Sequence, residues 1–169
     1  MTKHTLIVVR HAKAQDYASG TDERRALTNA GKVQAHKLGV ALRPFLTSLD
    51  DAFVSPAVRA QKTWEGLALG AGIDLESVNV STEPVIYSMS ATTIWDTVRI
   101  QSTGMSSIVV GHEPTISELA RKLVKKDDDS PIEWGMPTGS AVILSCDRGW
   151  SDWTNHCANL EGFEHVPHR

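Results

Sequence analysis

The sequence predicts a three-layer α/β/α fold, in which helices cover both faces of a mostly parallel central sheet. Short apolar runs typical of buried strands alternate with amphipathic segments typical of helices over most of the chain. The run Leu6-Ile7-Val8-Val9 is aliphatic at every position, as expected for a strand buried on both faces. Since 169 residues suit one core of ordinary size, we expect a single domain over residues 1–169.

The first strand is expected at about residues 4–10 and the first helix after Thr28. The polar residues 14–25 between them are too many for a simple connection, so we expect an exposed loop. Thr28 is a suitable N-cap, and apolar residues follow it at helical spacing among Lys and Gln. Pro44 marks the last turn or the end of this helix.

Further strands and helices follow in alternation. We expect strands at 52–54, 78–80 and 106–110, and helices at 56–70, at 91–101 and from 114 onward. Ser55-Pro56 begins the first of these helices, because Ser is a favoured N-cap and Pro is favoured at the first helical position. Pro114 likewise begins the last.

The last third of the chain predicts a β-hairpin. Residues 138–146 and 152–157 have strand character and flank a turn near Gly149. In that register Cys146 faces Ser151 and Cys157 faces Ser140, so the two thiols are not opposed. We therefore expect free cysteines and no disulfide.

Composition and charge exclude several classes of function. A net charge of −3 leaves no broad basic surface, which argues against a nucleic-acid partner. No apolar stretch approaches the ~20 residues that span a bilayer, and the N-terminus lacks a signal-peptide core. We expect no membrane association and a cytoplasmic location.

Charged residues follow three of the expected parallel strands. The first strand ends in Arg10-His11, the second leads into Arg59, and the fourth ends in Gly111-His112. Because the carboxyl ends of parallel strands lie at one edge of a sheet, these side chains can converge there. Two guanidinium groups, two imidazoles and two nearby helix N-termini suit a phosphoryl group.

Two histidines in such a site have separable uses. One can attack phosphorus and hold the phosphoryl group covalently, which divides a difficult displacement into two steps. The other can donate a hydrogen bond to the phosphoryl oxygens, as the arginines do with full charge. Because the protein itself supplies the positive charge, we expect neither a metal nor a cofactor.

Three motifs resemble the histidine phosphatase superfamily, also called phosphoglycerate-mutase-like. They are Arg10-His11-Ala12, the segment Ser55-Pro56-Ala57-Val58-Arg59-Ala60-Gln61-Lys62-Thr63, and Gly111-His112, in the order that the superfamily has them. The chain looks most like the short SixA-type phosphohistidine phosphatases. Arg10-His11-Ala12-Lys13-Ala14, the segment Arg25-Ala26-Leu27-Thr28-Asn29-Ala30-Gly31 and the short stretch between Arg59 and His112 support this. The last feature implies an open pocket.

The resemblance implies a role for each site residue. His11 would be the nucleophile, and Arg10, Arg59 and His112 would bind the phosphoryl oxygens, with Lys13 either adding positive charge at the mouth or simply solvated. Glu83 occupies about the place where many members have a general acid. Glu113 is another candidate, or the chain lacks an acid, as SixA-type enzymes are thought to.

The resulting hypothesis is a phosphatase that works through phosphohistidine at His11, with phosphohistidine on another protein as its substrate. One alternative keeps the reaction but makes the substrate a small phosphorylated metabolite. Another is a non-catalytic phosphate-binding or adaptor module. The intact set of Arg10, His11, Arg59 and His112 argues against the module.

Overall fold

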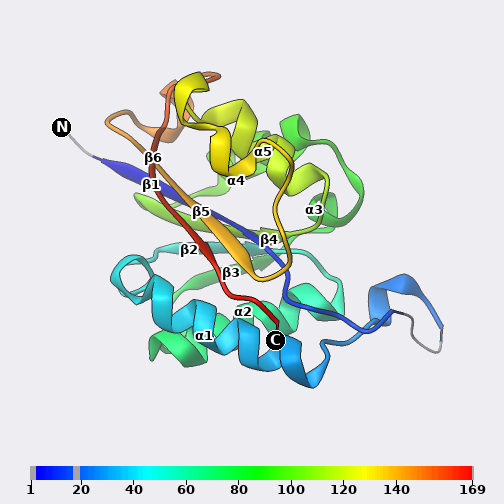
Figure 1. Ribbon diagram of the computed structural model, residues 1–169. Coiled ribbons are helices and arrows are strands. Elements are labelled where there is room, and N and C mark those ends of the chain that lie inside the picture. The colour runs from blue at the N-terminus through cyan, green and yellow to red at the C-terminus, as the bar shows by residue number, and fades with distance from the viewer. Residues whose placement is uncertain (1–2, 17–19, 169) are drawn as a thin grey trace.

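The computed structural model describes residues 3–16 and 20–168, and these form a sheet between two helical layers (Figure 1). Within the described residues the sheet has six strands in the order β3-β2-β4-β1-β5-β6. The strands are β1 (His4–Arg10), β2 (Asp51–Val54), β3 (Asn79–Thr82), β4 (Ser106–Gly111), β5 (Ser140–Cys146) and β6 (Asn159–His165). The pairs β1–β4, β4–β2 and β2–β3 are parallel, whereas β5 is antiparallel to both of its neighbours.

Helices cover both faces of the sheet, as the sequence predicts. They are α1 (Asn29–Leu46), α2 (Val58–Ala71), α3 (Pro84–Ser88), α4 (Ala91–Gln101) and α5 (Thr115–Leu123). Figure 1 shows α1 and α2 below the sheet and α3, α4 and α5 above it. Short 3₁₀ turns lie at Asp22–Arg24, Leu75–Ser77, Lys126–Asp128, Ser130–Ile132 and Trp150–Asp152. None of the described helices is long and apolar enough to cross a membrane.

The aliphatic run of β1 contributes to both halves of the core. Leu6 and Val8 pack in the cluster that includes α4 and α5, and Ile7 and Val9 pack in the cluster that includes α1 and α2. All four side chains are fully buried. Because successive side chains of a strand point to opposite faces, a continuous apolar run is what a central strand between two helical layers requires.

Helix starts differ from expectation by one or two residues. The second helix begins at Val58 rather than Pro56, and the fifth begins at Thr115 rather than Pro114. Ser55 still accepts a hydrogen bond from a backbone N–H, that of Ala57 at 3.2 Å, but it does so in the turn before the helix. By contrast, Thr28 caps α1 as predicted, by accepting from the Gly31 N–H at 3.0 Å.

The predicted second strand of the hairpin, 152–157, is wrong. The strand that pairs with β5 is β6, and the segment before it forms a 3₁₀ turn instead. Trp150 and Trp153 cause the difference, because their indoles are buried against Trp95 of α4, with ring centroids 6.1 and 5.4 Å from it. Burial of these large aromatic surfaces outweighs the strand character of the segment.

Because β5 pairs with β6 and not with residues 152–157, the expected pairing of Cys146 with Ser151 and of Cys157 with Ser140 is also wrong. Cys146 and Cys157 are free, as predicted, but the side chain of Cys157 lies beside that of Cys146. Burial raises the pKa of the Cys157 thiol, and the neighbouring thiol raises it further.

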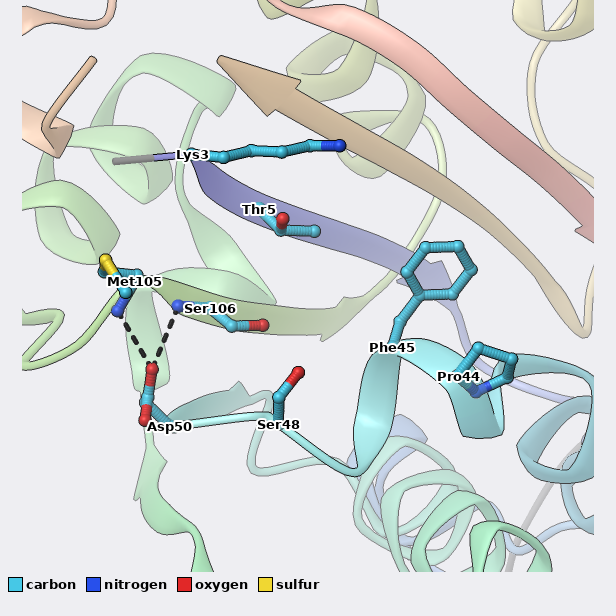
Figure 2. Close-up of a pocket in the computed structure, with 8 residues that line it drawn as sticks. All are labelled: Lys3, Thr5, Pro44, Phe45, Ser48, Asp50, Met105 and Ser106. Carbon is cyan, nitrogen blue, oxygen red and sulfur yellow. Dashed lines mark hydrogen bonds between the residues drawn. The ribbon is translucent and has the colours of Figure 1, made fainter. Parts of the chain in front are cut away.

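A cavity of about 180 Å³ lies at the amino ends of β1 and β4 (Figure 2). Its carboxylate, Asp50, accepts hydrogen bonds from the backbone N–H groups of Met105 and Ser106 at 2.9 and 3.1 Å. These contacts hold the start of β4 beside β2. The charged strand ends singled out in the sequence lie at the opposite edge of the sheet.

Candidate active site

The carboxyl ends of β1, β2 and β4 meet around a cavity of about 250 Å³. Arg10, His11, Arg59 and His112 all line it, so the convergence predicted from the strand ends is present. The other lining residues are Lys13, Ala14, Arg25, Glu113 and Thr138. The parallel pairing places Arg10 opposite Gly111, and the His11 N–H donates to the Gly111 carbonyl at 3.1 Å, which brings the two histidines together. Their ring centroids are 5.2 Å apart.

His11 is held as a neutral imidazole with a defined tautomer. Its Nδ1 donates to the Ala12 carbonyl oxygen at 2.7 Å. Since a carbonyl can only accept, Nδ1 carries the proton and Nε2 carries the lone pair. Burial, opposed by the bond to Ala12 and assisted by the positive charges around it, lowers the pKa of His11 to about 3. The ring is therefore unprotonated at neutral pH, with a free lone pair on Nε2.

His112 has the complementary arrangement. Its Nε2 lies 2.7 Å from the Ser55 hydroxyl, which already accepts from the Ala57 N–H. We assign the hydroxyl as the donor to Nε2, which leaves the ring proton on Nδ1. Burial, and then the charge of Arg59, lowers the pKa of His112 to about 4. His112 is a neutral hydrogen-bond donor at neutral pH.

Both arginines are anchored by one end of the guanidinium group. Arg10 Nη1 donates to the Met136 carbonyl oxygen at 2.8 Å. Arg59 Nη1 and Nη2 donate to the backbone oxygen and the carboxylate of Asp22, at 2.8 and 2.9 Å. Because the guanidinium group is planar and rigid, these contacts fix the direction of the remaining N–H groups.

Three donors at this site are buried without a partner. Among the described residues, the buried side-chain polar atoms that lack a hydrogen bond are Arg10 Nε, Arg59 Nε and His112 Nδ1. Each unsatisfied buried donor costs about 1–3 kcal/mol, so such atoms are rare in folded proteins. Three of them around one cavity indicate a ligand with several acceptor oxygens, and a phosphoryl group has that character.

Asp22 is a site residue that the sequence reasoning missed. It lies in the exposed loop predicted over 14–25, but its carboxylate accepts from Arg25 Nη1 at 3.0 Å and from the Tyr87 hydroxyl at 2.8 Å, besides its contact with Arg59. The hydrogen bonds from Arg25, Tyr87 and Arg59 hold the pKa of Asp22 well below its usual range. No spacing marks this residue in the sequence, because its partners come from three separate elements.

The remaining predicted site residues are Lys13, Glu83 and Glu113, and not all of them line the cavity. Lys13 and Glu113 line the cavity, whereas Glu83 does not. The Glu83 carboxylate accepts instead from the Ser81 hydroxyl at 2.6 Å. Glu113 accepts from the backbone N–H groups of Ser117 and Met136 at 3.0 and 3.1 Å. The described residues contain no cluster of three His, Cys, Asp or Glu side chains that could hold a metal ion.

Comparisons with known proteins identify the family of the chain. The family model of the histidine phosphatase superfamily (branch 1) matches residues 6–83. An uncharacterised protein of Mycobacterium tuberculosis is 32% identical over 165 residues, which cover 94% of this chain and 99% of that protein. A phosphohistidine phosphatase SixA homolog of Haemophilus influenzae is 30% identical over 128 residues, which cover 72% of this chain and 77% of that protein.

A solved structure of a similar protein supports the same fold and family. A structure assigned to the phosphohistidine phosphatase SixA of Nakamurella multipartitia superposes with a TM-score of 0.81 at 26% identity, covering 98% of this chain and 97% of that one. The predicted α/β/α fold with a mostly parallel sheet is thereby confirmed, as is the resemblance to SixA-type proteins. From its sequence, its fold and the set of residues at its strand ends, the chain belongs to the histidine phosphatase superfamily.

Proposed function

We propose that the protein removes the phosphoryl group from phosphohistidine on another protein, through a phosphohistidine intermediate at His11. The observation that carries the proposal is the set of three unpaired buried donors around a neutral imidazole. The donors suit the oxygens of a phosphoryl group, and the imidazole suits attack on its phosphorus.

In the first step the Nε2 lone pair of His11 forms a bond to phosphorus while the P–N bond to the substrate imidazole breaks. Arg10, Arg59 and His112 donate to the phosphoryl oxygens as charge spreads over them. When the other ring nitrogen of the substrate carries a proton, its imidazole leaves as a neutral molecule. The Ala12 carbonyl keeps the proton on His11 Nδ1 throughout.

In the second step a water oxygen attacks phosphorus and the P–Nε2 bond breaks. His11 leaves as the neutral imidazole that it was, and the water proton passes to phosphate or to solvent. The same three donors act in both steps, because the phosphoryl oxygens stay in place while the groups on either side of phosphorus exchange.

The surroundings of the cavity favour phosphohistidine over a phosphate ester. An alkoxide leaving group needs a proton donor, whereas an imidazole that keeps its own ring proton does not. Glu83 does not line the cavity, and the Glu113 carboxylate is occupied by backbone N–H groups. The similarity to SixA-type proteins supports the same substrate class.

The test is a turnover comparison with three kinds of substrate. A phosphohistidine-bearing protein, a phosphohistidine peptide, and a panel of sugar and nucleotide phosphates are assayed with the wild type and with His11→Asn. We expect turnover of the first two by the wild type alone, and quenched enzyme that carries acid-labile, alkali-stable phosphate. Faster turnover of a sugar or nucleotide phosphate would make the substrate a metabolite, and full activity in His11→Asn would refute the mechanism.

A further inference from the structure

A carboxylate borders the proposed phosphate site, although negative charge beside a bound anion is unfavourable. Glu113 lines the cavity, yet both of its oxygens are engaged elsewhere. Oε1 accepts from the Ser117 N–H at 3.0 Å, and Oε2 accepts from the Ser117 hydroxyl at 2.9 Å and from the Met136 N–H at 3.1 Å. The carboxylate therefore joins the start of α5 to the segment around Met136.

The same segment holds Arg10. The Met136 N–H donates to Glu113, and the Met136 carbonyl oxygen accepts from Arg10 Nη1 at 2.8 Å. A continuous path of two hydrogen bonds thus leads from the carboxylate, through residue 136, to the guanidinium group. Since Arg10 Nε is buried and unpaired, the carbonyl oxygen fixes one end of the group and leaves the other for the ligand.

The local backbone is shaped to admit the carboxylate. Gly135 has a φ of +101°, and a Cβ there would lie 2.8 Å from Glu113 Oε2. A side chain at 135 would be strained by that φ and would also displace the carboxylate. The approach of Glu113 to this segment therefore depends on glycine at 135.

We propose that Glu113 is a positioning residue for Arg10, acting through the residue 136 backbone rather than by touching the substrate. The inference rests on the proposed phosphate site and adds a residue to it. The proposal predicts the direction in which anion affinity changes when Glu113 is removed. If Glu113 were only a nearby negative charge, removing it would strengthen anion binding. If it positions Arg10, removing it releases the guanidinium group and weakens anion binding.

The experiment uses tungstate, a tetrahedral oxyanion, in place of phosphate and measures its affinity by titration calorimetry. The values of kcat and KM for a phosphohistidine peptide are measured as well. The variants are Glu113→Ala, which removes both charge and acceptor, and Gly135→Ala, which keeps the charge but displaces the carboxylate. Glu118→Gln is the control, because Glu118 is an exposed carboxylate in the first turn of α5, the helix that begins two residues after Glu113. Thermal unfolding of each variant confirms that it folds.

We expect tungstate affinity to fall on the order of 10-fold in Glu113→Ala and in Gly135→Ala, with KM rising more than kcat falls. In Glu118→Gln it should stay equal or rise slightly. In an Arg10→Ala background, Glu113→Ala should no longer weaken binding, because the two residues act as one unit.

Two results would overturn the proposal. If Glu113→Ala binds tungstate as tightly as the wild type or more tightly, Glu113 is only a neighbouring charge. If its effect is unchanged in the Arg10→Ala background, it acts by another route. A wild type that does not bind tungstate at all would instead refute the phosphate site on which the proposal rests.

Discussion

Burial of His11 in its neutral form makes the stability of the fold depend on pH. The pKa of His11 is lowered from 6.5 to about 3 by burial, so between these values the unfolded chain binds a proton that the folded protein does not. The contribution of His11 to folding stability is therefore full above about pH 6.5 and is lost as the pH falls toward 3. Replacing His11 with Asn removes this contribution, while the Asn side-chain N–H can still donate to the Ala12 carbonyl.

The size of the effect follows from the two pKa values. At pH 5 the unfolded imidazole, with its pKa of 6.5, is protonated and the folded one is not. A difference of ~1.5 pH units at about 1.4 kcal/mol per unit gives about 2 kcal/mol of stability lost between pH 7.5 and pH 5 through this residue alone. The wild type should lose about 2 kcal/mol more than His11→Asn over that interval.

Urea unfolding of both proteins at the two pH values, without phosphate, measures this difference. The other titrating groups are common to the two proteins, so their contributions cancel in the comparison. Equal losses in the wild type and in His11→Asn would show that the folded protein does protonate residue 11. The interpretation of His11 as a neutral nucleophile would then be wrong.

Other predictions concern the groups around the cavity. Thr63→Val should destabilise the fold by about 1–3 kcal/mol in urea unfolding. The buried Thr63 hydroxyl accepts from the Ala12 N–H at 2.9 Å, and a valine side chain cannot. An unchanged free energy of unfolding would mean that this N–H finds another partner. Asp22→Asn should lower kcat/KM several-fold, because it weakens the contact that orients Arg59; an increase would show that Asp22 competes with the substrate. Chelators should leave turnover unchanged in steady-state assays, since the proposed reaction needs no metal, and a strong loss would point to a metal phosphatase.

The main elements and the central site were predictable from sequence for a simple reason. Arg10 ends an apolar strand, His11 and His112 directly follow one and Arg59 lies just beyond one. The parallel sheet alone therefore brings them to one edge. That inference needs only the period of the elements and the direction of the strands.

The contacts that orient those residues could not be predicted in this way. Arg59 is held by Asp22 from an irregular loop, and Arg10 is held by a backbone carbonyl, that of Met136, which any residue type could provide. Such bonds depend on the course of loops rather than on periodicity. The strand predicted at 152–157 failed for a related reason, since burial of Trp150 and Trp153 is a tertiary effect.

Trp150 and Trp153, together with Trp95 of α4, also give the protein an optical signature. The indoles of Trp150 and Trp153 lie 5.1 Å apart and both contact Trp95, which is close enough for their electronic transitions to couple. The Trp150 indole N–H donates to the Gly104 carbonyl oxygen, near the start of β4, so the cluster lies toward the edge opposite the cavity that Arg10 and His11 line. Near-ultraviolet circular dichroism should therefore report the packing of α4 on the sheet, independently of what the cavity holds.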